Sequence, residues 1–356
     1  MGVGSPANMR RIAPSLLLAT LLSACRPGGG GVQPLDMAGF SGSVTILTLN
    51  LANGAGDVYR TPESRQRQAA FIADSGAQLV GMQEVDLSVE RSGRADCARE
   101  VARMDCAAAG FTPDGVRSCA GAGGTVAFGI GFRGDDPFAP ENGLPGGIDD
   151  SDPTLNPTGT DRTHDAVYGN AVAALGAVPV SDVYAVTLPT QDTQAADDPL
   201  FATLGRTGPT DPARAELATR NLALRTGPAI EPRVALVARI ARDGKPLSVI
   251  VTHLESAGGD ALRRRQLERV ARVAAAERAG PPARNVVVLG DFNQSPIETG
   301  VVLGAADFRR AVGEPAASLE NFDQIWVDQG LSVLSAAQVP TRGVSDHPNA
   351  GRVTVR

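Results

Sequence analysis

Apolar runs that end abruptly in polar residues are the main pattern along this chain. Residues 286–290 form a mostly β-branched run that leads directly into Asp291 and, two positions later, Asn293. Residues 44–50 form a similar run that ends in Asn50. Side chains two positions apart on a strand point to the same side, so Asp291 and Asn293 are expected to face one environment. The pattern predicts buried strands whose ends carry chemically active side chains.

The same pattern continues along the chain and alternates with helical signals. A helix is expected after the first strand, because Thr61 suits an N-cap, Pro62 suits the first turn and Gly76 suits the end. Further helices are predicted at 95–109 and 260–278. The remaining predicted strands are 78–84, 125–132, 168–174, 233–240, 247–254, 322–327 and 352–356. This alternation indicates an α/β domain.

The N-terminus has the order of a bacterial export signal. Met9-Arg10-Arg11 is a short basic start, residues 12–22 are apolar, and Leu-Ser-Ala precedes Cys25. Small residues before a cysteine resemble the lipobox of bacterial lipoproteins. This resemblance implies that Cys25 is lipidated and that the protein is exported and membrane-anchored, in the periplasm or at the cell surface. An ordinary cleaved secretory signal is the alternative.

The length of the chain limits the number of domains. It has 356 residues, enough for one large α/β domain or two small ones. No second segment is apolar over a length that spans a membrane. We divide the chain into a signal peptide at 1–25, a flexible Gly-rich tether at 26–41 and one domain at 42–356.

Charge and cysteine content narrow the function classes. The formal net charge is −6, which argues against a passive nucleic-acid binder, because such a protein carries a basic face. It does not exclude an enzyme that contacts a polyanion through a metal. Cys97, Cys106 and Cys119 follow no zinc-binding spacing, and export permits a disulfide. We expect a structural bridge at Cys119 and leave its partner open.

Polar residues recur at the ends of several predicted strands. The short motifs that carry them are Leu49-Asn50, Gln83-Glu84-Val85, Tyr168-Gly169-Asn170, Thr252-His253-Leu254, Gly290-Asp291-Phe292-Asn293, Phe322-Asp323-Gln324-Ile325 and Ser345-Asp346-His347. Each motif is weak alone, but their order along nearly the whole mature chain is specific. In this order they resemble the endonuclease/exonuclease/phosphatase superfamily, which includes pancreatic-type DNases, apurinic endonucleases, bacterial sphingomyelinases and inositol polyphosphate phosphatases.

The resemblance implies a fold and a metal site. The fold is a four-layer α/β sandwich, in which two mixed β-sheets pack face to face with helices outside. Glu84 would be the principal ligand of a divalent metal, with Asn50 and Asp346 in the same metal shell. Magnesium is the metal that the family implies, and manganese is the alternative. Oxygen ligands from carboxylate and amide groups suit both ions.

The resemblance also implies roles in hydrolysis. His347 would be the general base or the acid–base partner of His253, and Asp323 would orient His347 through its ring N–H. Asp291 would position the attacking water or the leaving oxygen. The phosphate oxygens, where charge grows in the transition state, would be held by His253 and two amides. These amides are Asn293 and Asn170.

Three functions follow from this reading. The first is a magnesium-dependent phosphodiesterase outside the cytoplasm, either a nuclease or a sphingomyelinase-like enzyme that acts on a phospholipid headgroup. The second is a phosphomonoesterase on the same scaffold. The third is a non-catalytic binding lipoprotein, since a fold alone does not prove chemistry. Two long Pro/Gly/Asp-rich segments, 133–163 and 187–217, are expected to shape the substrate mouth.

Each polar residue also has a structural alternative. Glu84 alone is an ordinary loop charge or helix cap, and Asn50 and Asn170 alone are turn residues. His253 alone is a partly buried histidine with satisfied hydrogen bonds, and Asp323 alone is an exposed strand charge. The non-catalytic reading predicts that some of the site motif would be lost. The chain retains Glu84, Asp291, Asn293, Asp346 and His347.

Overall fold

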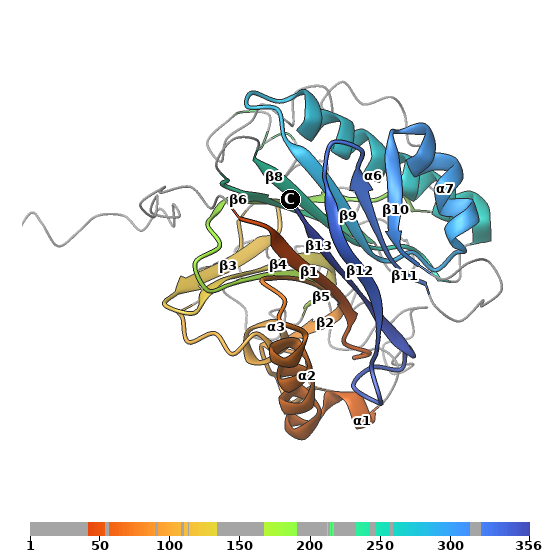
Figure 1. Ribbon diagram of the computed structural model, residues 1–356. Coiled ribbons are helices and arrows are strands. Elements are labelled where there is room, and N and C mark those ends of the chain that lie inside the picture. Colours follow the sequence, from red (N-terminus) through yellow and green to blue (C-terminus); the bar gives the residue numbers. More distant parts are fainter. Residues whose placement is uncertain are drawn as a thin grey trace, which may run out of the picture. The chain divides into compact units, whose positions relative to one another are not determined.

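The apolar strands pair into two β-sheets, which Figure 1 shows at the centre of the protein. The first sheet has the order β12-β13-β1-β2-β5-β4-β3 and the second has the order β10-β11-β9-β8-β7-β6. The strands of the first are β1 (Val44–Asn50), β2 (Leu79–Leu87), β3 (Val116–Gly121), β4 (Gly124–Arg133), β5 (Val167–Leu175), β12 (Val333–Pro340) and β13 (Asn349–Val355). The strands of the second are β6 (Val180–Thr187), β7 (Val234–Ile240), β8 (Leu247–His253), β9 (Asn285–Asp291), β10 (Phe308–Val312) and β11 (Asp323–Asp328).

The computed structural model places every described residue in one compact unit, Pro34–Arg356. The predicted signal peptide with Cys25, the tether and most of the two long segments lie outside the described residues. No helix in the described part is both long and apolar enough to cross a membrane. The described residues are 42–53, 57–89, 92–107, 110–112, 114–133, 167–190, 212, 214, 216, 233–242, 246–256, 259–313 and 322–356.

Both sheets are mixed and pack face to face. Within each sheet one neighbouring pair is parallel, β1 with β2 and β8 with β9, whereas the other pairs are antiparallel. Gly81 of β2 shows how close the sheets are, because a Cβ there would lie 2.2 Å from the Leu289 side chain of β9. A continuous apolar core, built from both inner faces, fills the space between them.

Helices cover the outer faces. The helices of the described residues are α1 (Asp57–Arg60), α2 (Pro62–Ser75), α3 (Cys97–Val101), α6 (Gly259–Ala279) and α7 (Pro296–Ala305). Side chains of α2 and α3 join the apolar cluster on the outer face of the first sheet, and side chains of α6 and α7 join the cluster on the second. Figure 1 shows the two helix pairs on opposite sides of the sheets. The predicted four-layer α/β sandwich is therefore confirmed.

The expected α2 boundaries match the structure, but the predicted helix at 95–109 does not. Within the described residues of this range only Cys97–Val101 is helical, because Arg103 adopts a left-handed backbone with a φ of 53° and turns the chain away. Cys106 then forms a disulfide with Cys119 of β3, which confirms a bridge at Cys119. Elements that the sequence pattern did not predict are β3, β6, β10, β12, α1 and α7.

A buried polar network attaches α6 to the second sheet. Glu277, near the end of α6, accepts hydrogen bonds from Arg239 of β7 at 2.7 and 3.0 Å. It also accepts them from the Tyr184 hydroxyl at 2.7 Å and from the Ser248 hydroxyl at 2.6 Å. Burial opposes the charge on Glu277, but these donors outweigh it and lower the pKa of Glu277. One carboxylate therefore joins α6 to β6, β7 and β8.

Arg214 belongs to the second long segment and is buried against the edges of both sheets. Its guanidinium forms ion pairs with Asp182 of β6 and with Asp114, which precedes β3 and lies 3.7 Å away. The guanidinium also stacks over the Tyr184 ring at 3.9 Å from the ring centroid. Arg214 therefore bridges the β3 and β6 edges of the sandwich.

Candidate active site

Strand pairing brings three of the polar strand ends into one row. Asp291 ends β9, and its direct neighbours across the sheet are His253, which ends β8, and Asp323, which begins β11. In the facing sheet, Asn50 ends β1 beside Gln83 of β2. The two sheets therefore present their polar strand ends at the same end of the sandwich.

The carboxylate of Asp291 is the point on which these side chains converge. Its Oδ2 lies 3.3 Å from Nδ2 of Asn50, 3.4 Å from Nε2 of His253 and 3.5 Å from Nε2 of His347. Its Oδ1 accepts a hydrogen bond from the backbone N–H of Asn293 at 2.9 Å. Asn50 Nδ2 also donates to Oε1 of Glu84 at 3.0 Å. Residues from both sheets therefore meet around one buried acid.

Unusual backbone conformations position Asp291 and Glu84. Gly290 has a φ of 143°, and a Cβ there would lie 1.8 Å from the carbonyl oxygen of Thr252, so only glycine lets β9 run beside β8 up to Asp291. Glu84 has a φ of 53° and lies in a bulge, where the register between β2 and β5 shifts. Bulges re-aim side chains and are common beside active sites.

His347 is surrounded by acids. Its Nδ1 lies 3.3 Å from Oδ2 of the buried Asp323, an ion-pair contact without hydrogen-bond geometry. Burial lowers the pKa of His347, but the carboxylates of Asp323, Asp291 and Asp346 outweigh it and raise the pKa to about 10. Burial raises the pKa of Asp291 and of Asp323, against the opposing charge of His347. His347 therefore holds a proton within reach of Asp291.

His253 has the opposite electrostatic setting. Burial, together with the positive charges of Arg233 and His347, lowers the pKa of His253 well below its ordinary value. Arg233 precedes β7, and its Nη1 lies 3.1 Å from Nδ1 of His253. Its Nε lies 3.6 Å from Oε2 of Glu255. His253 is therefore a neutral imidazole beside a guanidinium.

Arg233 and Glu255 are site residues that the sequence pattern missed. Arg233 is the first position of the predicted strand 233–240, and Glu255 follows the His253 motif. β7 and β8 are antiparallel, with Ala235 opposite Thr252, so the start of β7 lies beside the end of β8. Only this pairing reveals that Arg233 neighbours His253.

The predicted phosphate-binding amides are partly engaged in hydrogen bonds, and Asn170 is buried whereas Asn293 is half-buried. Asn170 of β5 donates from Nδ2 to the carbonyl oxygen of Val234 at 2.8 Å. Asn293 donates from Nδ2 to the carbonyl oxygen of Leu254 at 2.8 Å. A carboxamide has two N–H donors, so each amide retains a second one. Both amides are therefore held in fixed orientations near the convergent strand ends.

The possible metal ligands differ in part from the predicted set. Ligand atoms of Glu84, His253 and Asp291 all lie within 4.8 Å of one another. Asp346 is exposed, and its Oδ1 accepts a hydrogen bond from Ser345 at 3.3 Å. Asn50 directs its amide nitrogen at Glu84 and Asp291, while its Oδ1 accepts from the backbone of Ala52 at 2.8 Å. The two carboxylates suit a hard divalent cation.

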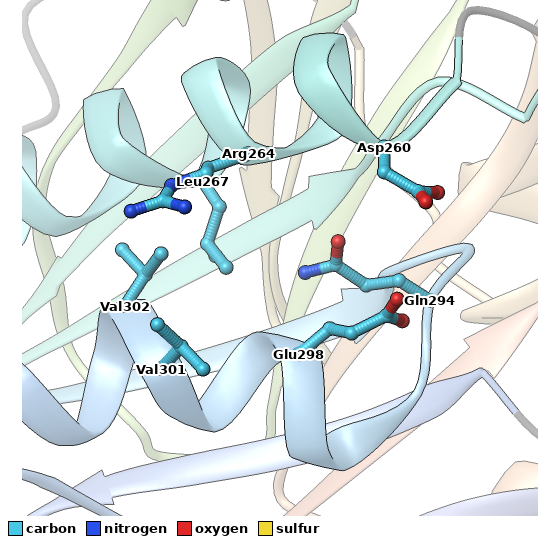
Figure 2. Close-up of a pocket in the computed structure, with 7 residues that line it drawn as sticks. All are labelled: Asp260, Arg264, Leu267, Gln294, Glu298, Val301 and Val302. Carbon is cyan, nitrogen blue, oxygen red and sulfur yellow. The ribbon is translucent and has the colours of Figure 1, made fainter.

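A groove of about 210 Å³ opens between α6 and α7 (Figure 2). Both helices begin just beyond the strand ends that carry His253 and Asp291. The acidic and amide side chains lie toward that end, and the apolar ones lie farther along the helices (Figure 2). The groove is formed by residues other than the convergent acids. The lining residues are Asp260, Arg264, Leu267, Gln294, Glu298, Val301 and Val302.

Comparisons with known proteins agree with this architecture. The profile described as the Endonuclease/Exonuclease/phosphatase family matches residues 47–347. Comparison with curated protein sequences gave no match. The family match extends from the first strand to His347 and includes every strand end described above.

Solved structures with the same fold are similar over most of the chain. The endonuclease/exonuclease/phosphatase from Beutenbergia cavernae DSM 12333 has 15% identity and a TM-score of 0.50, over 88% of this chain and 71% of that one. The Bacteroides vulgatus protein has 17% identity and a TM-score of 0.50, over 89% and 99%. The human nocturnin catalytic domain, solved with a bound sulfate anion, has 14% identity and a TM-score of 0.51, over 88% and 93%. At these identities the similarity establishes the fold.

Proposed function

Because the chain belongs to the endonuclease/exonuclease/phosphatase family, we propose that it is a magnesium-dependent phosphodiesterase. Its substrate is a nucleic acid or a phospholipid headgroup. The observation that carries the proposal is the convergence of Asn50, His253 and His347 on the carboxylate of Asp291, with Glu84 one hydrogen bond away. Buried acids beside imidazoles with oppositely shifted pKa values are typical of hydrolytic sites.

Glu84 and Asp291 would hold the divalent ion, with Asn50 and Asp346 contributing to its shell. Their oxygen atoms suit magnesium, and manganese is the alternative. The ion would supply charge stabilisation for the phosphate and a more acidic bound water.

The side chains of the protein would carry out the proton transfer and the positioning of the substrate. His347 moves the proton at Nε2, because its Nδ1 faces Asp323 and its Nε2 faces Asp291. Asp291 positions the attacking water or the leaving oxygen. Asn170 and Asn293 offer their second N–H donors to the phosphate oxygens, where charge grows in the transition state. Fixed donors of this kind need no reorganisation during the reaction.

A substrate panel tests the proposal. Supercoiled plasmid, phosphatidylcholine vesicles, a small phosphodiester and a small phosphomonoester are each incubated with the protein in magnesium and in EDTA. We expect magnesium-dependent turnover of at least one diester. Turnover of the monoester alone would instead establish a phosphomonoesterase. Absence of all turnover by folded protein would favour the non-catalytic binding protein.

Glu84 is expected to dominate metal affinity. Replacing Glu84 with glutamine should weaken manganese binding by more than about 100-fold, since even indirect supporting groups cost about 10–100-fold. Calorimetric titration of each variant measures the affinity. The matched control is Glu63→Gln, a change at an exposed carboxylate in the first turn of α2, which should bind as the unmodified protein does. Equal affinities for all three proteins would remove Glu84 from the metal site.

We also propose that the protein is an exported lipoprotein anchored through Cys25. The disulfide between Cys106 and Cys119 supports export, because disulfides persist in oxidising compartments. Cys25→Ser should move the protein from the membrane fraction to the soluble fraction without lowering its catalytic rate. Fractionation and immunoblotting measure this, and a Cys25→Ser protein that stays with the membrane would contradict the anchor.

A further inference from the structure

Gln68 of α2 joins two loops that carry residues of the candidate site. Its side chain is fully buried. Its Nε2 donates hydrogen bonds to the carbonyl oxygen of Leu51 at 2.9 Å and to that of Val344 at 3.2 Å. Leu51 follows Asn50 at the end of β1, and Val344 precedes the Ser345-Asp346-His347 motif between β12 and β13. One side-chain amide on an outer helix therefore holds both loops.

The contact with Leu51 reaches the side chain of Asn50 through a single peptide group. The peptide between Leu51 and Ala52 is trans, so its carbonyl and its N–H point in opposite directions. Gln68 bonds the carbonyl, and the N–H donates to Oδ1 of Asn50 at 2.8 Å. This bond leaves Nδ2 of Asn50 directed at the carboxylates of the site. Gln68 therefore fixes the peptide that orients the carboxamide of Asn50.

The loop after β1 has a backbone conformation that its surroundings must hold. Ala52 has a φ of 57°, in the left-handed region that alanine rarely adopts. Strained residues of this kind persist only where neighbouring contacts determine their conformation. The carbonyl bonded by Gln68 lies directly before Ala52, and Arg60 donates from Nε to the carbonyl oxygen of Asn53 at 2.7 Å. Loss of the Gln68 bond should therefore allow this peptide to rotate.

The contact with Val344 acts on the loop that carries His347. The Val344 N–H donates to the carbonyl oxygen of Thr341 at 3.1 Å, which bends this loop on itself. Gln68 ties the bent loop to the loop after β1. The side chains of the two segments also meet, because Nδ2 of Asn50 lies 3.5 Å from Nε2 of His347. Gln68 therefore holds two segments whose side chains come together in the site.

The bonding of Gln68 indicates that its donors are what this position requires. A carboxamide has two N–H donors, and Gln68 uses both on the two carbonyls. Its Oε1 is buried and has no hydrogen-bond partner in the described part of the chain, a cost that an apolar side chain would avoid. An apolar side chain would, however, deprive both loops of this donor. The two loops, rather than the packing of α2, therefore account for the amide.

We propose that Gln68 is a positioning residue of the reaction centre, which sets the carboxamide of Asn50 and the loop of His347 relative to each other. The part that Asn50 and His347 play in hydrolysis rests on the proposed function. The holding of the two loops rests only on the hydrogen bonds of Gln68 and can be measured without catalysis.

Hydrogen exchange followed by mass spectrometry in EDTA tests the positioning without any need for activity. Gln68→Met keeps the length of the side chain but removes both donors. We expect exchange in peptides covering 50–53 and 341–347 to become about 5–10-fold faster, as expected when one hydrogen bond is lost, while exchange in β8 and β9 stays unchanged. The matched control is Gln66→Met, a change at an exposed glutamine of the same helix, which should alter none of these peptides.

Two results of this measurement would overturn the inference. One is equal exchange of both loops in Gln68→Met and in the unmodified protein. The other is faster exchange throughout α2 and the first sheet with the loops no faster than the rest, because that result would show a general loss of stability. If Gln68→Met does not fold, Gln68→Asn replaces it under the same criteria, since its amide is one methylene too short to reach both carbonyls.

Kinetics with a small phosphodiester and magnesium supply the second readout. Gln68→Met should lower kcat by about 10–100-fold, the usual loss when a group that orients site residues is removed. KM should change little, because Asn170 and Asn293 are held by other bonds. An unchanged kcat in a variant with faster loop exchange would contradict a role in the reaction centre. If the unmodified protein hydrolyses nothing, the proposed function fails, but the exchange result still decides whether Gln68 positions the two loops.

Discussion

Replacing His347 with alanine is expected to lower kcat/KM for phosphoester hydrolysis by about 10²–10⁴-fold, the contribution typical of a positioned acid–base group. The side chain is 15% exposed, lies 3.5 Å from Asp291 and carries a pKa raised to about 10 by its acidic neighbours. Its loss removes the group that moves the proton. Initial rates with a small phosphodiester at saturating magnesium measure the effect.

Asp323→Asn provides a graded comparison for this change. It removes the charge that faces Nδ1 of His347 at 3.3 Å but keeps the side-chain shape, so its loss of rate should be smaller than that of His347→Ala. Circular dichroism and the unfolding midpoint of each variant establish that the fold is intact. A folded His347→Ala protein with full activity would exclude His347 from the chemistry.

Replacing Glu277 with alanine is expected to be the most destabilising single change considered. Removing one partner of a buried charged network costs about 3–5 kcal/mol, because the other charge is left uncompensated. Glu277 is fully buried and accepts from Arg239, Tyr184 and Ser248. Urea denaturation at pH 7 measures the change in the free energy of unfolding.

The stability lost in Glu277→Ala is expected to depend on pH in a defined direction. The folded-state pKa of Glu277 lies below its ordinary value, so its stabilisation is complete above the unfolded pKa and is lost as the pH falls through the folded one. The difference between the two proteins should therefore shrink below about pH 4. The control is Glu268→Ala on the same helix, where the exposed pair with Arg264 is worth about 0–1 kcal/mol. Equal losses for both variants would contradict the role of the network.

Much of the fold follows from local patterns in the sequence. The apolar runs that form β1, β8 and β9 are nearly continuous. Each ends in a polar side chain of the candidate site, namely Asn50, His253 or Asp291. β12 lacks such a signal, because it is an edge strand whose residues are all exposed or only partly buried. The short α7 had a sequence signal that the apolar pattern overlooked, because Ser295 and Glu298 form a capping box and Pro296 lies in the first turn. The helix expected at 95–109 fails because Arg103 turns the chain toward the Cys106–Cys119 bridge.

The sequence predicts a residue of the candidate site only where that residue belongs to a motif at the end of a strand. Asn50, Glu84, His253 and Asp291 belong to such motifs, and the structure brings them within hydrogen-bonding or ion-pair reach of one another. Arg233 lies at the opposite end of its strand, so only the antiparallel pairing of β7 with β8 brings it to His253. The Asn50 orientation likewise depends on contacts made across both sheets.

The most direct test of the central claim is hydrolysis of bis(p-nitrophenyl) phosphate by residues 42–356, with magnesium, with EDTA and with magnesium restored. The claim is that the acids around Asp291 form a divalent-metal phosphoesterase centre. It predicts release of p-nitrophenolate that EDTA stops, that magnesium restores, and that Glu84→Gln and His347→Ala each reduce strongly. Hydrolysis that is equal in EDTA, or equal in both variants, would contradict the claim.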